Sequence, residues 1–268
     1  MVRREIEDKS VAAIKLWVDD VGGSVPKLDP EIYGAIIEYA RMQNVPVFAH
    51  MRNLEDGKEL IRRGVTALVH TPPEVDEEIL QLAQDRGVAA MPTLTGAYGA
   101  RAYAEGASFL SDPGLPHLFP ASVLETLGSA EYQARIADNT NLDEARAEYN
   151  QASEYVAKAA EAGIPFFIGS DSGPPTRFAG FWEHREMELL VQAGLTPMQA
   201  IQAATINGAR VLHVDSRYGS LEAGKVADLV ILNADPLADI TNSRRIDSVW
   251  MNGEPVDRNS LGMAHGGS

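Results

Sequence analysis

Four residues of this chain have side chains that commonly bind metal ions or transfer protons, and each lies in or beside a short apolar run. They are Lys15, His50, His70 and Asp171. Taken singly, each has a simpler explanation. Lys15 could be neutralised by Asp19 or Asp20, and one histidine at a strand end is usually a packing or rim residue. Four such residues in one chain favour a shared site.

Their positions matter because the carboxyl ends of parallel strands meet at one edge of a sheet. His50 and His70 each close an apolar run, and Asp171 follows another run among small residues. Alternation along Ala12–Trp17 points Lys15 away from its apolar neighbours. Barrel enzymes keep their catalytic groups at this edge. We therefore predict that the four residues lie at the ends of parallel strands and converge on one opening, here called the mouth, at the carboxyl edge of the sheet.

The elements that would position them are βα units, because short apolar runs alternate with helical patterns. The predicted strands are Val11–Val18, Val45–His50, Ala67–His70, Val88–Thr93 and Phe166–Ser170. The predicted helices are one that begins at Asp29-Pro30, Leu54–Arg63, Pro73–Arg86, Glu131–Ala162, Trp182–Ala193 and 196–213. Gly64 and Gly87 stand where helices end on a residue with positive φ.

Two stretches depart from this alternation. Residues 94–129 are rich in glycine and proline and are too long for an ordinary connection, so we expect a functional loop or lid with short helices. After Gly219 the pattern changes to short β runs, Ala227–Leu232 and Ile246–Met251, with a hairpin turn at Asn252-Gly253. A small β module is predicted there.

Composition limits the kind of partner. The chain is 45% hydrophobic and 23% charged, which is typical of a globular protein. Its 23 basic and 38 acidic residues give a net charge of −15, which disfavours nucleic acid and anionic membranes as partners. Cysteine is absent, so any metal must bind histidine and oxygen ligands. The first residues lack a secretory core, which favours a cytoplasmic protein.

With these motifs in place, the sequence resembles the amidohydrolase superfamily, especially its imidazolonepropionase-like and prolidase-like members. The resemblance covers nearly the whole chain. Its specific pieces are Ile14–Asp20, Phe48–His50, Pro92–Leu94, Leu68–His70, Gly169–Gly173, Ala203–Ala209 and Gly224–Leu232.

The resemblance implies a role for each of the four residues. Lys15 matches a lysine that carbon dioxide carbamylates and that bridges two metal ions, and His50 and His70 match ligands of the more exposed ion. Asp171 matches a catalytic aspartate that binds the more buried ion and moves protons. Zinc is the default divalent metal for such ligands. The implied reaction is hydrolysis of an amide-type C–N bond in a small molecule, dipeptide or cyclic amide through a metal-activated water.

The resemblance also has a gap at its front. Such enzymes carry a His-x-His pair on the first barrel strand, well before the lysine, whereas 14 residues precede Lys15 here. We therefore predict an α/β fold, an incomplete TIM-like (β/α) barrel with strands four to eight. The predicted partial barrel covers residues 1–213, a C-terminal β-sandwich remnant covers 214–258, and a disordered tail covers 259–268.

Two interpretations of this gap follow. The chain is either a fragment or is completed by a second chain, and we expect it to self-associate or to need the missing N-terminal segment. The alternative to a hydrolase function is that the chain is a catalytically incompetent fragment or remnant that acts only as an assembly partner.

Loops at the expected mouth hold further candidates for substrate binding. They are Tyr98, Arg101, Arg177 and His117. Each could equally be an ordinary solvated loop residue. His184 could also line the mouth, although a place on a helix surface is favoured.

Overall fold

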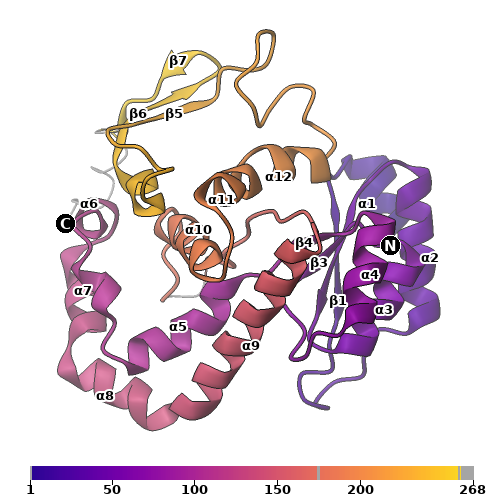
Figure 1. The fold of residues 1–268 in the computed structure, drawn as a ribbon, viewed down its shortest axis with the longest axis horizontal. Coiled ribbons are helices and arrows are strands. Elements are labelled where there is room, and N and C mark those ends of the chain that lie inside the picture. The colour runs from indigo at the N-terminus through magenta and orange to yellow at the C-terminus, as the bar shows by residue number, and fades with distance from the viewer. Residues whose placement is uncertain (1, 174–175, 259, 261–268) are drawn as a thin grey trace.

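The N-terminal part of the molecule contains a four-stranded parallel sheet (Figure 1). The computed structural model describes residues 2–173, 176–258 and 260. The strands lie in the order in which they follow one another along the chain: β1 (Ile14–Val18), β2 (Val47–Met51), β3 (Ala67–Val69) and β4 (Ala89–Met91). This confirms the α/β class and the first four predicted strands.

The two faces of the sheet differ from the first strand onward. In β1, Ile14, Leu16 and Val18 are buried, whereas Lys15 and Trp17 are exposed. The register pairs Lys15 with Phe48 and Trp17 with His50, so these side chains share one face, here called the inner face. The alternation in the sequence therefore predicted the face of Lys15 correctly.

The fifth predicted strand is reduced to a single parallel bridge between Ala90 and Phe166. Phe167 N–H donates to the Ala90 carbonyl at 3.0 Å, which holds this segment beside β4. The next amide, that of Ile168, instead donates to the Ala203 carbonyl at 3.1 Å. The backbone therefore leaves the sheet after Phe167, and the predicted strand Phe166–Ser170 is wrong in extent.

The helices that connect the strands begin and end at the signals seen in the sequence. They are α1 (Val2–Lys9), α2 (Pro30–Met42), α3 (Leu54–Arg63) and α4 (Glu77–Arg86). Asp29, Asn53 and Asp76 cap the N-termini of α2, α3 and α4 through side-chain oxygens. Gly64 and Gly87 end α3 and α4 with positive φ, as predicted. Figure 1 shows α1–α4 together on one side of the sheet.

The stretch predicted as a loop or lid is mostly helical. It contains α5 (Leu94–Ala104), the 3-10 helix η1 (Ser108–Ser111), α6 (Leu115–Leu118) and α7 (Ala121–Gly128). The long helix predicted over Glu131–Ala162 is two helices, α8 (Ala130–Asn139) and α9 (Leu142–Glu161). The break occurs because the Asn141 side chain accepts the Glu144 N–H at 3.3 Å and starts α9 as its N-cap.

The remaining helices lead into the C-terminal module. They are α10 (Phe181–Gln192), α11 (Pro197–Ala204), α12 (Ile206–Val211) and the 3-10 helix η2 (Ile240–Arg244). The helix predicted over 196–213 is thus broken at Thr205, whose backbone (φ −133°, ψ −97°) is not helical.

A three-stranded antiparallel sheet completes the C-terminal part. Its strands are β5 (Leu229–Leu232), β6 (Ile246–Met251) and β7 (Glu254–Pro255), in that order. This confirms the small β module, while its place in a sandwich and the domain boundary at residue 213 stay predictions. The predicted disordered tail lies outside the described residues, apart from Ser260.

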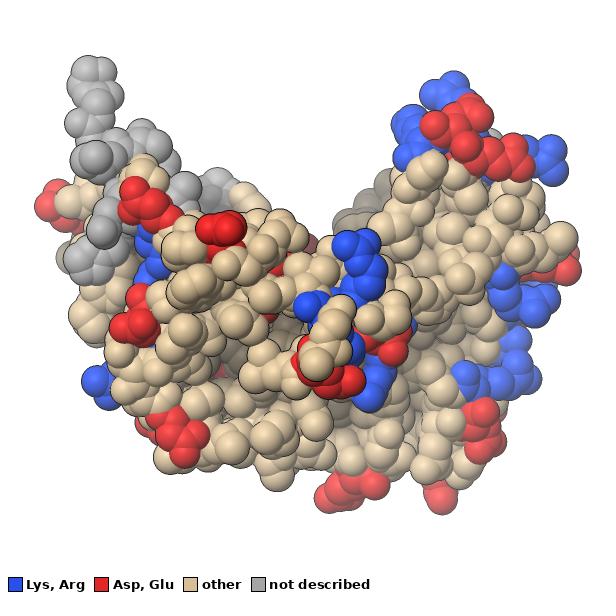
Figure 2. Space-filling model, turned by 90° about the horizontal axis from the view of Figure 1, so that it is seen from above, with Lys and Arg blue, Asp and Glu red and all other residues tan. Residues whose placement is uncertain are grey.

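The surface agrees with the mixed charge of the sequence. On the face drawn in Figure 2, acidic and basic side chains are interspersed around a hollow between two raised parts of the molecule. Within the described part of the chain, no helix is both long and apolar enough to cross a membrane.

Candidate active site

The predicted site residues gather at the carboxyl edge of the parallel sheet, with Lys15 set deeper. His50 lies next to the last residue of β2, in register with Trp17 and Val69. His70 directly follows β3. Lys15 is the second residue of β1 rather than its last, so it does not close its strand as expected.

His50 is buried, and its imidazole is held by two residues of the β1 segment. The indole of Trp17 stacks on the ring at a centroid distance of 3.7 Å and an interplanar angle of 10°. The Asp19 Oδ2 lies 2.9 Å from His50 Nε2. His50 Nδ1 is buried and has no hydrogen-bond partner among the described residues. Burial lowers the pKa of His50, and the hydrogen bond with Asp19 opposes that shift.

His70 reaches the inner face by a departure from strand geometry. Strict alternation would send it to the opposite face, because its neighbour Val69 is the residue paired with His50. Its φ of +70° breaks the alternation, and its ring meets that of His50 edge-on at 4.5 Å. Burial, followed by the charges of His50 and Lys15, lowers the pKa of His70 to about 4. The imidazole is therefore neutral at pH 7, which is the form that binds metals.

Lys15 and Asp171 are coupled through space. Burial of the amine lowers the pKa of Lys15 even though much of the side chain is exposed, while the Asp171 carboxylate raises it. The Asp171 carboxylate also opposes the lowering of the His70 pKa. Asp171 is itself held by Arg177, whose Nη1 donates to Oδ2 at 2.6 Å. The four predicted residues thus form one electrostatic neighbourhood.

Three residues that follow strands or the bridged segment have positive φ although none is glycine. His70 follows β3, Thr93 follows β4 and Asp171 follows the Phe166 segment, with φ values of +70°, +56° and +53°. Such conformations cost of order 1–3 kcal/mol each and persist where the surrounding structure enforces them. They are three of the nine non-glycine residues with positive φ in the described part of the chain, and two of the three are predicted site residues.

Two glutamates of α10 hydrogen bond with the segments that follow the strands at this edge, and sequence reasoning did not find them. Glu186 is fully buried and accepts the backbone N–H groups of Leu94 and Thr95, each at 2.8 Å. The Thr95 hydroxyl lies 2.8 Å from Glu186 Oε2 and 3.0 Å from the Ser170 carbonyl, so it links the start of α5 to the Asp171 loop. Burial raises the pKa of Glu186 to about 7.

Glu183 holds the other side of the same loop. Its Oε1 accepts hydrogen bonds from the Ser170 and Ser172 hydroxyls at 2.6 and 2.9 Å, and its Oε2 accepts the Gly180 N–H at 2.6 Å. The signal in the sequence was the pair Glu183 and Glu186, three apart on a helix soon after Asp171.

The residues predicted to bind substrate lie in different environments. Tyr98 is 6% exposed and packs against Trp182 in the core. Arg101 lies over the Tyr149 ring at 4.2 Å from its centroid. His117 lies on α6, and its side chain lies outside the described residues. Among the three whose side chains are described, Arg177 contacts one of the four central residues directly, namely Asp171. A substrate role for this group stays a prediction.

His184 faces the C-terminal module rather than the mouth. Its Nδ1 lies 3.0 Å from the Ser243 hydroxyl of η2. The neighbouring Arg244 pairs with the buried Glu188 of α10 and, at 3.1 Å, with Asp112 near α6. These contacts join α10, the segment between η1 and α6, and η2.

The donor set fits a metal in part. His50 and His70 present neutral, adjacent imidazoles, and His50 Nδ1 is a buried nitrogen without a partner. Yet nowhere in residues 2–173, 176–258 and 260 do three or more His, Asp or Glu side chains lie together as a metal site. Two imidazoles could therefore supply part of a coordination shell, and other donors would have to complete it.

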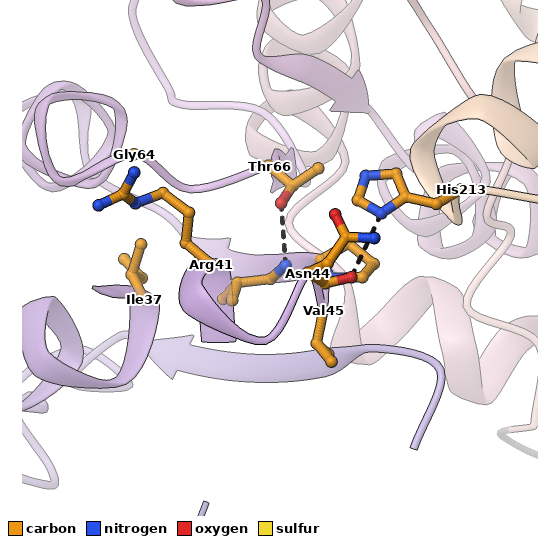
Figure 3. A pocket seen from close by; sticks show the side chains of 9 residues that line it. Ile37, Arg41, Asn44, Val45, Gly64, Thr66 and His213 are labelled. Atoms are coloured by element: carbon orange, nitrogen blue, oxygen red, sulfur yellow. Dashed lines mark hydrogen bonds between the residues drawn. The ribbon is translucent and has the colours of Figure 1, made fainter. Parts of the chain in front are cut away.

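The cavity drawn in Figure 3 lies away from these residues. It has a volume of about 190 Å³, and its lining includes Val45, Pro46 and Val47 at the start of β2, whereas His50 lies near the end of that strand. His213 Nδ1 closes one side, 3.3 Å from the Asn44 carbonyl (Figure 3). This end of the sheet is opposite the end that carries His50 and His70. We therefore assign this cavity no catalytic role.

Three known proteins resemble this chain, two of them over most of its length. Ochratoxinase of Aspergillus niger is 25% identical over 235 residues, which is 85% of this chain and 41% of ochratoxinase. Imidazolonepropionase of Christiangramia forsetii is 31% identical over 103 residues, 37% of this chain and 25% of that protein. The crystal structure of a putative prolidase from Bifidobacterium longum is 28% identical with a TM-score of 0.68, covering 96% of this chain and 58% of the prolidase.

The chain thus spans about half the length of two of these proteins, 41% of ochratoxinase and 58% of the prolidase. A model of the amidohydrolase family matches residues 23–256, which include His50, His70 and Asp171. The chain therefore belongs to the amidohydrolase family.

Proposed function

We propose that this chain forms the greater part of the active site of a metal-dependent hydrolase that cleaves an amide-type C–N bond. The observation that carries the proposal is the pair His50 and His70, two neutral imidazoles in edge contact at the carboxyl edge of the sheet in a member of the amidohydrolase family. The substrate class is a small molecule, such as a dipeptide or a cyclic amide.

His50 and His70 would hold a divalent ion, for which zinc is the first choice, and Lys15 would add a carbamate oxygen. When bound, the ion would polarise the scissile carbonyl and lower the pKa of water to about 7. Lys15 is suited to its part because burial lowers the pKa of its amine and so increases the unprotonated fraction. That nitrogen would form a bond to the carbon of carbon dioxide and release one proton.

Asp171 would transfer protons in this reaction. It would take a proton from the attacking water and deliver it to the leaving nitrogen. Arg177 orients the carboxylate from one side through Oδ2, and Glu183 and Glu186 fix the loop that carries it. Arg177 would also be placed to meet a substrate carboxylate once a substrate enters.

We further propose that the active site is completed by a barrel segment from outside this chain, supplied by a preceding stretch of the natural protein or by a second chain. Two observations support this: the chain spans about half of its relatives, and β1 pairs with β2 alone among the described strands. The incomplete barrel and the C-terminal sandwich remnant belong to the same proposal, and so does the cytoplasmic location.

An activity assay tests this proposal. The chain would be co-expressed with the N-terminal barrel segment of a full-length family member and offered N-acyl amino acids, dipeptides and cyclic amides with zinc. We expect amine release to be very low for the chain alone, to rise with the added segment, and to be abolished by Asp171→Asn. Amine release that is unchanged by Asp171→Asn would contradict the proposal. The absence of amine release from the chain co-expressed with the added segment would contradict it too.

A further inference from the structure

The imidazole of His50 is restrained on its face, at one edge and by a neighbouring ring. Trp17 covers the face at 3.7 Å, Asp19 meets Nε2 at 2.9 Å, and His70 contacts the ring at 4.5 Å. Of the two nitrogens of this ring, Nδ1 is buried and has no hydrogen-bond partner among the described residues.

Hydrogen-bond chemistry then fixes the tautomer. An ionised carboxylate only accepts hydrogen bonds, so a neutral His50 must carry its proton on Nε2 and donate it to Asp19. Nδ1 is left with a free lone pair. A buried lone pair with no donor is costly in a folded protein unless something binds it.

The carboxylate that selects this tautomer is itself anchored. Asp19 Oδ1 accepts the Val21 N–H at 2.9 Å, while Oδ2 faces His50. Trp17 and Asp19 are two residues apart, which places them on the same side of the β1 segment. The Trp17-x-Asp19 pair therefore brackets a histidine on the neighbouring strand, and the side chain of the adjacent Asp20 makes no such contact with His50.

We propose that Asp19 is a positioning residue that keeps His50 in the Nε2–H tautomer and so presents Nδ1 as the metal-binding nitrogen. This inference rests on the proposed function for the metal itself. Carboxylates that orient metal-binding histidines typically affect metal affinity by 10- to 100-fold.

Nitrogen-15 NMR of histidine-labelled protein, without metal, tests the arrangement directly. In the wild-type chain we expect His50 to show a protonated Nε2 and an unprotonated Nδ1. Asp19→Asn can donate its amide to Nε2 and should move the proton to Nδ1. Asp20→Asn is the matched control and should leave the wild-type pattern unchanged. A wild-type His50 protonated on Nδ1, or an Asp19→Asn spectrum equal to wild type, would overturn the proposal.

A zinc titration of the same proteins supplies the second readout. We expect Asp19→Asn to weaken zinc binding about 10- to 100-fold and Asp20→Asn to leave it unchanged, with thermal unfolding checking that each variant is folded. Equal zinc affinity in Asp19→Asn and wild type would overturn the positioning role. No zinc binding by the wild-type chain, with the expected tautomer present, would overturn the metal assignment and the proposed function, but not the Asp19–His50 arrangement.

Discussion

At the scale of single residues, the residues that form the site could be predicted from the sequence, but the hydrogen-bond partner of each could not. Residue type and strand position were enough to predict that Lys15, His50, His70 and Asp171 lie close enough to interact electrostatically. Asp19 and Asp20 were considered as alternative partners that could neutralise Lys15, yet Asp19 hydrogen bonds with His50 on the next strand. Such a pairing depends on strand register, which short motifs do not encode.

Glu186 gives a pH-dependent prediction at this scale. Burial raises the pKa of Glu186 from 4.5 to about 7, so the folded chain holds a proton that the unfolded chain releases. This contribution to the free energy of unfolding is fully present below pH 4.5 and is lost as the pH rises through 7. We expect a loss on the order of 1 kcal/mol per pH unit within that window.

Urea unfolding at pH 5, 6 and 7 measures this contribution. Glu186→Gln should remove the part of the slope that Glu186 contributes, so its stability should fall less with rising pH than that of the wild type. Because its amide group would face backbone donors, the variant should also cost about 1–3 kcal/mol at pH 5. Glu161→Gln, on an exposed helix end, is the control and should keep the wild-type slope. If wild type and Glu186→Gln lose stability equally with pH, Glu186 is not the titrating group.

At the scale of elements, caps were more reliable guides than apolar periodicity. Helix ends at Asp29, Gly64 and Gly87 were predicted because each has a local chemical cause. The break at Asn141 was missed because apolar spacing continues across it while a side-chain hydrogen bond restarts the helix. The bridged segment at Phe166 was overestimated because the partner of Ile168, the Ala203 carbonyl, is distant in sequence.

Gly219 gives a prediction about how the C-terminal segment packs on α12. Its φ is +91°, and a Cβ added there would lie 2.8 Å from the Ile206 Cα, a backbone atom that cannot easily move. Gly224 has a similar φ of +94° but open space around it. We expect Gly224→Ala to cost about 1 kcal/mol from backbone strain alone, and Gly219→Ala to cost about 1–3 kcal/mol more.

Chemical denaturation of both glycine variants checks this comparison. The free energies of unfolding should fall in the order wild type, Gly224→Ala, Gly219→Ala. Equal costs for the two variants would mean that the close approach between Gly219 and α12 contributes nothing to stability.

At the scale of the whole molecule, the family was recognisable from motifs, and the α/β class followed from alternation. The sequence did not predict how far the sheet closes toward a barrel, because closure depends on contacts among strands that lie far apart along the chain. The described strands form an open parallel sheet with β1 at one edge. The C-terminal sheet leaves Val230 and Met251 more than half exposed on one face.

These surfaces predict association of the isolated chain. An unpaired strand edge and exposed apolar side chains favour contacts between molecules. Sedimentation velocity at micromolar concentrations should show concentration-dependent association. The double variant Val230→Lys/Met251→Lys should shift the chain toward monomer, whereas Met42→Lys, which alters an exposed methionine of α2, should not. A compact monomer at every wild-type concentration would contradict this expectation.

The central claim is that His50 and His70 together hold a metal ion. Equilibrium dialysis against zinc, followed by elemental analysis, measures the metal bound per chain in wild type, His50→Ala, His70→Ala and the control His213→Ala, which alters the cavity at the opposite end of the sheet. We predict at most one equivalent for the isolated chain, because the described donors fill only part of a coordination shell. That equivalent should be lost in either site variant and kept in His213→Ala. Zinc bound equally by all four proteins, or two tightly bound equivalents in the isolated chain, would contradict the account.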